Sequence, residues 1–339
     1  MPVTVHAYAA PEKGKPFEAF EYDLPDELDH DQVEIEVDHC GLCHSDLSML
    51  NNDWGMTQYP FVGGHEASGR VVRVGQHVPA LKVGDTVGLG WYSRTCMHCR
   101  QCLSGNQNRC PDGEGTIVGR HGAFADRVRA HWAWCLKIPD GLDPRDVGPM
   151  FCGGITAFTP FINHRINGLS RVGVIGIGGL GHLALQFSRG FGAETIAFST
   201  SPDKEDEAKK LGADRLVNVK NDGALDKLAG AFDLILNTTN VALDWDAYLA
   251  CLAPGGTLHT VGAVEGDFGV KQVFPMIQGE RALAASPLGP PVRTADMLDF
   301  AARHDIHPVT EHLPMSKIND AFDKLENGSP RYRMVLDRD

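Results

Sequence analysis

The chain has 339 residues, of which 42% are hydrophobic and 22% charged, with a formal net charge of −13. This length accommodates two domains with separate cores, and the composition is that of a globular enzyme. The acidic balance argues against nucleic acid and anionic membrane surfaces as partners. No apolar run reaches the ~20 residues of a membrane span, and the start lacks the pattern of a signal peptide. We therefore expect a cytoplasmic protein.

Residues 1–140 are predicted to be rich in β-strands. Apolar and acidic residues alternate over 33–38 (VEIEVD), and the segment 83–87 (VGDTV) contains a glycine turn. Such alternation with frequent glycine turns predicts a compact, twisted β barrel or sandwich. From about Asp143 helical and strand patterns alternate, which indicates a doubly wound parallel sheet. From about Pro290 the chain returns to helix and short strand.

Four of the nine cysteines fall within fifteen residues, in the pattern Cys96-x2-Cys99-x2-Cys102-x7-Cys110. Four thiolates at this spacing can close a tetrahedron around one zinc ion and leave no open position, which predicts a structural site. An iron–sulfur cluster has similar spacing, but nothing else in the sequence suggests electron transfer. A zinc ribbon that binds nucleic acid is disfavoured by the acidic balance.

The segment 171–204 predicts strand, glycine turn, helix and second strand. Gly176, Gly178 and Gly181 stand in G-x-G-x-x-G register directly after a β-branched run, with Gly179 between them, and a helical pattern follows. In this context the glycines allow a tight turn, close approach of a pyrophosphate and close packing of helix on strand. We expect a dinucleotide there, with its phosphates on the free N–H groups that begin the helix. The alternative is an ordinary strand–helix turn.

The end of the second strand bears on the choice of cofactor. A carboxylate there would hold a ribose 2′-hydroxyl, but this chain has Ser199, Thr200 and Ser201, with Lys204 one turn later. Hydroxyl donors and one cation suit a 2′-phosphate, so we expect NADP(H) rather than NAD(H). Asp203 follows a proline and is expected to point away from the pocket. Alternatively, the serines only cap the next helix.

A second set of metal-binding residue types is dispersed along the chain. It contains Cys43 in CGLCHSD, His65 and Glu66 in GGHE, and Cys152 in FCGGIT. Two thiolates and one imidazole are the ligands of the catalytic zinc in alcohol dehydrogenases, where the fourth position is open to a substrate oxygen. The alternative is that these are three unrelated buried residues. For Cys152 considered alone, this alternative is the better explanation.

These motifs together resemble the zinc-containing medium-chain alcohol dehydrogenases, in particular the cinnamyl alcohol dehydrogenase branch. The resemblance covers nearly the whole chain and rests on CGLCHSDL, YPFVGGHEASGRVVRVG, the four-cysteine loop, FCGGITAF, GIGGLGHLALQFSRGFG, STSPDK, LGAD and RYRMVLD. It implies a β-rich, GroES-like catalytic zinc domain at 1–145 and 290–339, and an inserted Rossmann NADP-binding domain at 146–289. It also implies a homodimer, often formed by joining the edges of two cofactor sheets.

The resemblance assigns roles to individual residues of the catalytic site. Cys43, His65 and Cys152 match the catalytic zinc ligands, and Glu66 matches a carboxylate that can enter the coordination sphere. Asp46 matches an acid that orients the histidine ligand, and Ser45 matches the hydroxyl that touches the substrate oxygen. His44 matches a residue beside the cofactor phosphates, and Thr156 matches one near the nicotinamide. The remaining residues expected at the cofactor are Leu180, Thr238, Val261 and Gly262.

Two departures from the family pattern concern the proton path and the rim of the site. The plant branch has a histidine, a later proton carrier, where this chain has Ser48, so the route beyond Ser45 is open: ribose hydroxyl and water continue it, or Asp53 ends it. The segment after Cys110 is also shorter than in plant and yeast relatives, which implies a more open rim.

The resemblance also places large apolar side chains in the substrate channel, namely Trp54, Met56 and Trp91, with Met49 nearby. Taken alone, each of these is more often a core residue than a pocket residue, but Trp54 and Met56 lie just beyond Cys43, which matches a zinc ligand, and this favours a pocket. We therefore expect aromatic and medium aliphatic aldehydes as substrates.

The sequence thus predicts a zinc-dependent alcohol dehydrogenase or aldehyde reductase with two zinc ions per chain. It would transfer hydride reversibly between NADP(H) and a primary alcohol or aldehyde. One alternative is an NAD-dependent polyol or secondary-alcohol dehydrogenase with a polar pocket. Another is a non-catalytic structural or sensing relative, which degraded zinc ligands would reveal; Cys43, His65 and Cys152 are all intact.

Overall fold

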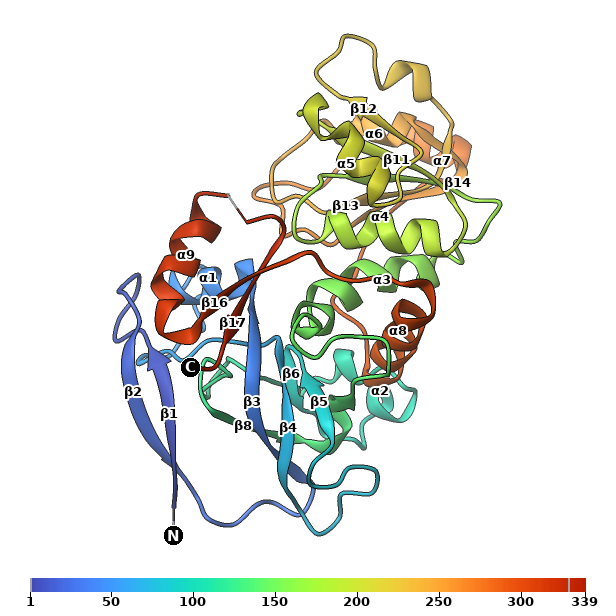
Figure 1. The fold of residues 1–339 in the computed structure, drawn as a ribbon. Helices are drawn as coiled ribbons and strands as arrows, with labels where there is room; N and C mark the ends of the chain where they lie inside the picture. Colours follow the sequence, from blue (N-terminus) through green and yellow to red (C-terminus); the bar gives the residue numbers. More distant parts are fainter. Residues whose placement is uncertain (1, 329) are drawn as a thin grey trace. The chain divides into compact units, whose positions relative to one another are not determined.

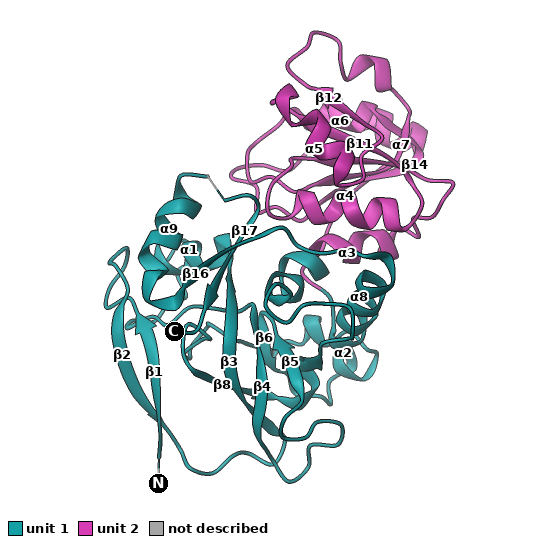
Figure 2. Ribbon diagram, viewed as in Figure 1, with its two compact units in different colours: residues 1–155, 289–339 teal, residues 156–288 magenta. Residues whose placement is uncertain are grey.

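The computed structural model describes residues 2–328 and 330–339 and divides into two compact units. Unit 1 comprises Met1–Ile155 and Gly289–Asp339, and unit 2 comprises Thr156–Leu288 (Figure 2). Unit 2 is therefore inserted into the chain of unit 1. The first boundary falls inside helix α3 (Gly153–Asn163), whereas the sequence placed it before this helix.

Unit 1 is built around a seven-stranded sheet in the order β16-β17-β3-β4-β5-β9, with β8 paired to β3 (Figure 1). All pairs are antiparallel except β16 with β17. The strands are β3 (Gln32–Leu42), β4 (Ala67–Val74), β5 (Thr86–Leu89), β8 (Arg127–His131), β9 (Cys135–Lys137), β16 (Thr310–Pro314) and β17 (Arg333–Asp337). Two further two-stranded sheets join β1 (Val3–Ala9) to β2 (Glu18–Leu24) and β6 (Tyr92–Arg94) to β7 (Glu114–Gly115).

The alternating segment of β3 supplies much of the core of unit 1. Val33, Ile35 and Val37 have no exposed surface and join one apolar cluster with Phe124 of the β7–β8 connection. Glu34 departs from the alternation: it is fully buried, and the guanidinium of Arg129 lies 2.7 Å from its carboxylate. The helices of unit 1 are α1 (His44–Leu50), α2 (Arg100–Leu103), α8 (Pro291–His304) and α9 (Ile318–Glu326).

Unit 2 is a six-stranded, wholly parallel sheet in the order β12-β11-β10-β13-β14-β15. The strands are β10 (Arg171–Ile175), β11 (Glu194–Ser199), β12 (Arg215–Asn218), β13 (Phe232–Asn237), β14 (Leu252–Thr260) and β15 (Ala282–Ala285). Its helices, besides α3, are α4 (Gly181–Gly190), α5 (Glu205–Lys210), α6 (Trp245–Ala250) and α7 (Phe274–Gly279). From β10 the chain winds outward through β11 and β12, then crosses to β13 and winds the other way. The β10/β13 junction is thus a topological switch point, where ligands of such folds bind.

The predicted fold class is confirmed, and the differences are local. The sequence missed β12, a four-residue edge strand. Strand β14 begins at Leu252, before Pro254 and Gly255, and its pairing with β13 changes register between Leu252 and Thr257. Among the described residues, no helix has the length and hydropathy needed to cross a lipid bilayer.

Candidate zinc centre and nucleotide site

The first turn of α1 organises the zinc centre of unit 1. Cys43 precedes α1, and its backbone N–H donates to Oδ2 of Asp46 at 3.0 Å. The other carboxylate oxygen of Asp46 accepts the N–H of Gly64 at 2.8 Å and lies 3.0 Å from Nδ1 of His65. Asp46 is fully buried, so this bond places the imidazole proton on Nδ1 and leaves Nε2 as a ligand atom.

Folding brings the two sulfurs and the imidazole together from three parts of the chain. Nε2 of His65 lies 3.3 Å from Sγ of Cys152, and this sulfur lies 4.0 Å from Sγ of Cys43. A carboxylate oxygen of Glu66 joins them, and the four ligand atoms lie within 4.8 Å of one another. Tetrahedral zinc with ordinary bond lengths separates two sulfurs by about 3.8 Å and a sulfur from a nitrogen by about 3.5 Å. The donor set therefore fits zinc in both chemistry and spacing.

Glu66 has a partner that sequence analysis missed. It is fully buried, and its Oε1 accepts a hydrogen bond from the guanidinium of Arg333, which is 6% exposed, on β17. Among the described residues its Oε2 has no hydrogen-bond partner, and a Cβ at Gly41 would lie only 2.2 Å from that oxygen. One carboxylate oxygen is thus neutralised while the other remains available to a metal. A buried glutamate requires a cation nearby, but the local sequence gives no clue that the cation lies 267 residues away.

The electrostatics of this cluster shift the pKa values of its groups in different directions, and Cys43 is the group shifted towards its ligating form. The pKa of Cys43 is held well below its ordinary value, chiefly by its hydrogen bond with Cys152. The hydrogen bond with His65 and the charge of Arg333 lower it further. Burial opposes the charged form of His65, but Asp46 and Cys43 outweigh it and raise the pKa of the imidazole. Burial raises the pKa of Glu66 against the opposing effect of Arg333. The cluster thus combines a cysteine of lowered thiol pKa with a second sulfur, an imidazole and a buried carboxyl group.

The four-cysteine segment forms a second, separate cluster in unit 1. Sγ of Cys96 lies 3.5 Å from that of Cys110 and 3.9 Å from that of Cys102, and Cys99 lies 3.9 Å from Cys110. Backbone N–H groups, first that of His98, donate to Cys96 and lower its pKa to about 6. Four sulfurs at these distances fit a closed zinc site.

Of the residues expected at the substrate, Trp54 and Trp91 lie close to each other and to His65, whereas Met49 lies in the core. The Trp91 ring contacts the His65 ring edge-to-face with centroids 5.1 Å apart, and Trp54 contacts Trp91 at 5.9 Å. Met56 is 45% exposed, whereas Met49 is 1% exposed and belongs to the core of unit 1. The two indoles therefore form an apolar wall over the zinc-ligand imidazole.

The polar residues that follow Cys43 in α1 differ in their surroundings. Ser45 Oγ lies 3.7 Å from Sγ of Cys43. His44 is exposed and Ser48 is half-buried. A hydroxyl thus stands next to a sulfur of the candidate zinc centre.

The glycine turn of unit 2 has the features of a phosphate cradle. Gly176 has φ +89°, and a Cβ at Gly181 would lie 2.0 Å from the carbonyl oxygen of Gly176, so both positions require glycine. A Cβ at Gly178 would meet no atom within 4 Å, and this is where a pyrophosphate would approach. Thr238 donates from Oγ1 to the carbonyl of Ile175 at 2.8 Å and holds β13 against the turn. The turn therefore fits a dinucleotide.

Lys204 links the end of β11 to this turn. Its Nζ donates to the carbonyl oxygen of Ile177 at 3.3 Å, while Ser199 Oγ accepts the N–H of Ser201 at 3.0 Å. Thr200 and Asp203 are exposed. One cation and a hydroxyl-rich loop thus stand beside the glycine turn at the carboxyl edge of the sheet.

The other expected cofactor residues occupy the same unit. Gly179 and Leu180 complete the turn before α4. Val261 and Gly262 follow β14, and both of their N–H groups donate to the carbonyl of Asn237, at 3.0 and 3.3 Å. Thr156 lies on α3, half-buried.

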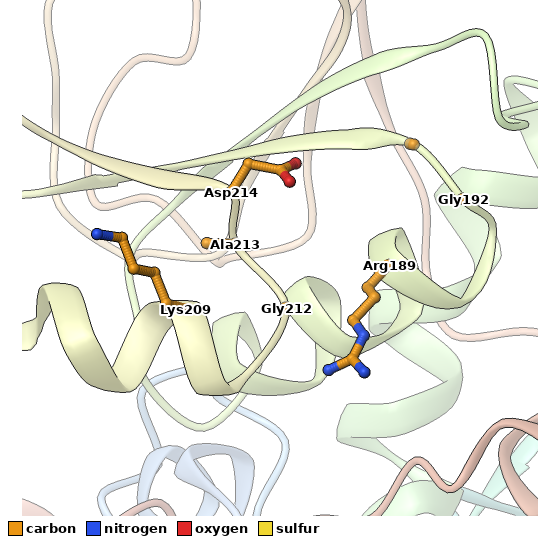
Figure 3. Close-up of a pocket in the computed structure, with 7 residues that line it drawn as sticks. Arg189, Gly192, Lys209, Gly212, Ala213 and Asp214 are labelled. Atoms are coloured by element: carbon orange, nitrogen blue, oxygen red, sulfur yellow. The ribbon is translucent and has the colours of Figure 1, made fainter.

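A surface pocket in unit 2 is distinct from the nucleotide site. It has a volume of about 350 Å³ and is lined by Arg189, Lys209 and Asp214 with neighbouring small residues (Figure 3). Arg189 lies in the last turn of α4, and the glycine turn lies at the start of this helix. Ten helical residues span about 15 Å, so this pocket is not the phosphate cradle.

Comparisons with known proteins agree with this geometry. The chain matches the alcohol dehydrogenase GroES-like domain over residues 29–140 and the zinc-binding dehydrogenase family over residues 179–303. It is 48% identical over 332 residues to the aldehyde reductase AdhA of Synechocystis sp., with 98% of each chain covered.

Two solved structures resemble the whole chain. The cinnamyl alcohol dehydrogenase SbCAD4 of Sorghum bicolor has a TM-score of 0.92 and 32% identity, covering 99% of this chain and 98% of that one. The CAD from Helicobacter pylori, solved in complex with NADP(H), has a TM-score of 0.90 and 26% identity, covering 99% of both chains.

The chain therefore belongs to the zinc-containing medium-chain alcohol dehydrogenases, and the resemblance found in its sequence is confirmed. Its activity is that of an alcohol or aldehyde dehydrogenase.

Proposed function

We propose that the chain is an NADP(H)-preferring reductase of aromatic and medium aliphatic aldehydes, which it interconverts with primary alcohols. The observation that carries this proposal is the meeting of Cys43, His65 and Cys152, with Asp46 bracing the imidazole. Zinc held by these ligands supplies Lewis acidity to a substrate oxygen, and NADPH supplies the hydride. We include a second, structural zinc on the four cysteines 96, 99, 102 and 110 and a cytoplasmic location in the proposal.

The protein's own residues orient the substrate and move a proton. Trp91 lies against His65 and Trp54 against Trp91, so an aromatic or aliphatic group gains apolar contact beside the metal ligands. Ser45 Oγ, next to Cys43, delivers the proton to the substrate oxygen in reduction and removes it in oxidation. Asp46 accepts hydrogen bonds from two backbone N–H groups and from Nδ1 of His65, and so keeps His65 in its ligand tautomer.

A turnover screen combined with metal analysis tests the proposal. Aromatic, medium aliphatic and polyol substrates are assayed with both nicotinamide cofactors, and zinc is measured on the same sample. We expect the highest kcat/KM with an aldehyde and NADPH at about two zinc ions per chain. The highest kcat/KM for a polyol with NAD would favour the polyol dehydrogenase, and no turnover of any pair at full zinc loading would favour a non-catalytic relative.

The preference for NADP(H) is supported by Lys204, whose ammonium reaches the glycine turn from the end of β11. No carboxylate lies on the last two residues of the strand, Phe198 and Ser199. We expect Lys204→Ala to raise the KM for NADPH about ten-fold and to leave the KM for NADH within two-fold, because only a 2′-phosphate needs the cation. Lys209→Ala, an exposed lysine paired with Glu205 in the same unit, is the matched control. Equal changes for both cofactors would remove the support for a 2′-phosphate site.

We also propose a homodimer that forms along the edge strand β15. This strand carries only alanine and leucine, while the opposite edge strand, β12, carries the exposed Arg215. An edge strand without charged side chains, such as β15, can pair with the edge of a second sheet. Next to it in sequence, α7 exposes Phe274 and Ile277, which are 72% and 69% accessible.

A further inference from the structure

Three polar side chains of unit 2 form a hydrogen-bonded line that the proposed mechanism does not use. Nε2 of His164, just after α3, lies 2.9 Å from Nδ1 of His259 on β14. Nε2 of His259 lies 2.9 Å from Oγ of Ser286, which follows β15. His259 is 2% exposed. A buried imidazole therefore connects the two other groups through both of its ring nitrogens.

Both imidazoles of this line are neutral at physiological pH. Burial, and then the nearby His164, lower the pKa of His259 to about 4, and burial also lowers the pKa of His164. A neutral imidazole has one N–H and one acceptor nitrogen, so the hydrogen bonds run in one direction along the line. In either direction the Ser286 hydroxyl is fixed by His259. No other side-chain bond of Ser286 is found within residues 2–328 and 330–339, so its remaining hydrogen-bonding capacity is available.

The position of Ser286 in the sheet indicates what this hydroxyl meets. It is the first residue after the carboxyl end of β15, and dinucleotides bind along the carboxyl edge of such sheets. On this edge Ser199 ends β11 and Lys204 follows it, the glycine turn follows β10, and β13, β14 and β15 lie in order on the other side. A dinucleotide with its 2′-phosphate near β11 and its pyrophosphate at β10 extends its nicotinamide half towards β15.

We propose that Ser286 Oγ binds the carboxamide of the nicotinamide, and that His259 and His164 are positioning residues that hold this hydroxyl. A carboxamide offers both a donor and an acceptor, so it matches Ser286 in either direction of the line. The proposal rests on the nicotinamide cofactor of the proposed function. It explains why the imidazole of His259 is buried at a place where an apolar side chain would fill the same space at a smaller desolvation cost.

Binding of a cofactor and of its fragment tests the role of Ser286. NADPH and 2′-phospho-ADP-ribose, which lacks the nicotinamide, are titrated against the protein, and dissociation constants are obtained by calorimetry. We expect Ser286→Ala to weaken NADPH binding about three- to ten-fold, the range of one neutral hydrogen bond, and to leave the fragment within two-fold. Ser170→Ala is the matched control, because Ser170 lies at the opposite, amino end of β10 and binds only a local backbone N–H.

The positioning role is tested by two replacements of His259. Leu removes the bond to Ser286, while Gln places its side-chain amide near the position of Nε2. We expect His259→Leu to weaken NADPH binding as Ser286→Ala does, and His259→Gln to restore most of it, with the fragment unchanged in both. Restoration by Gln distinguishes positioning from a loss of packing, because both replacements remove the ring.

Each outcome of these titrations decides between defined alternatives. Unchanged NADPH binding in Ser286→Ala overturns the proposal, and so does equal weakening of NADPH and the fragment, which would indicate a structural role. If the wild type binds NADH and ADP-ribose but neither phosphorylated ligand, the cofactor preference fails, and the same comparison with NADH and ADP-ribose still decides the role of Ser286. If the wild type binds no dinucleotide, the proposed function itself fails.

Discussion

Asp46 and Arg333 support the zinc ligands from opposite ends of the sequence. Asp46 binds the backbone N–H of Cys43 and Gly64 and the imidazole of His65, so one carboxylate fixes two ligands in one geometry. Arg333 neutralises Glu66 from β17. Such supporting residues set ligand orientation and the charge of the site, and here both are buried.

The buried pair of Arg333 and Glu66 predicts a large effect on stability. Arg333→Met leaves a buried carboxylate without its cation, which costs about 3–5 kcal/mol. The free energy of unfolding in urea, measured with saturating zinc, should fall by this amount. The double variant Glu66→Gln with Arg333→Met should recover part of the loss, because neither position of the pair then carries an unpaired charge.

An exposed arginine provides the control for this experiment. Arg70 on β4 pairs with Glu36 and Asp38, and its side chain is 55% exposed. We expect Arg70→Met to cost at most about 1 kcal/mol, as for surface ion pairs. A loss of less than 1 kcal/mol for Arg333→Met as well would show that the pair at Glu66 contributes little.

His259 predicts how stability depends on pH. Its pKa in the folded protein is about 4, below the ordinary value of 6.5, so the unfolded state binds more protons between these values. The lowered pKa of His259 stabilises the folded state fully above pH 6.5, and this stabilisation is lost as the pH falls towards 4. The free energy of unfolding therefore falls by about 2 kcal/mol between pH 7.5 and pH 5 on this account. His259→Leu should therefore lose about 2 kcal/mol less than the wild type over this range in urea unfolding. The exposed His304→Gln serves as the control; parallel pH profiles for the wild type and His259→Leu would contradict the prediction.

At the scale of elements, the sequence predicts best what a local pattern determines. The strand, glycine turn, helix and second strand around Gly176 follow from β-branched runs, glycine spacing and helical periodicity, and the structure shows all four. β12 has four residues and no run of buried apolar side chains, so it carries too little pattern to be recognised. Arg333 and the His164–His259–Ser286 line were missed for another reason: their contacts join residues far apart in sequence, and no local pattern encodes them.

We expect the fold of the four-cysteine lobe, residues 96–110, to depend on the proposed structural zinc. It contains α2, with four residues, and a 3-10 turn at Gln107–Arg109, and helices this short do not persist on their own. We expect Cys102→Ala to reduce zinc from about two to about one per chain and to make the segment 96–110 susceptible to trypsin, which cleaves after arginine. Metal analysis and mass mapping of the fragments measure both effects.

The control for the lobe is a cysteine of the same unit outside both clusters. Cys135 on β9 is buried, and burial raises its thiol pKa to about 12, as expected for a core residue. Cys135→Ala should retain two zinc ions and resist trypsin in the lobe. If Cys102→Ala also retained two zinc ions, the closed four-sulfur site would be wrong.

At the scale of the whole molecule, each unit carries one half of the chemistry. Unit 1 contains both clusters of metal-ligating residues, and unit 2 contains the glycine turn and Lys204. The order of motifs in the sequence predicts this division, because the glycine motif interrupts two segments with β-type patterns. The sequence does not mark the exact boundary between the units, since helix α3 continues through it without interruption.

The assembly of whole molecules is tested on α7. Phe274 and Ile277 expose large apolar surfaces next in sequence to the charge-free edge strand β15, and burying them in a second copy removes that surface from water. The double variant Phe274→Asp with Ile277→Asp places two carboxylates there, so we expect the proposed dimer to dissociate into monomers in size-exclusion chromatography with light scattering. Leu169→Asp is the matched control, because Leu169 is 97% exposed in the same unit but lies at a turn before β10. Dimers that persist in the double variant would exclude α7 from the interface, and a monomeric wild type would refute the proposed assembly.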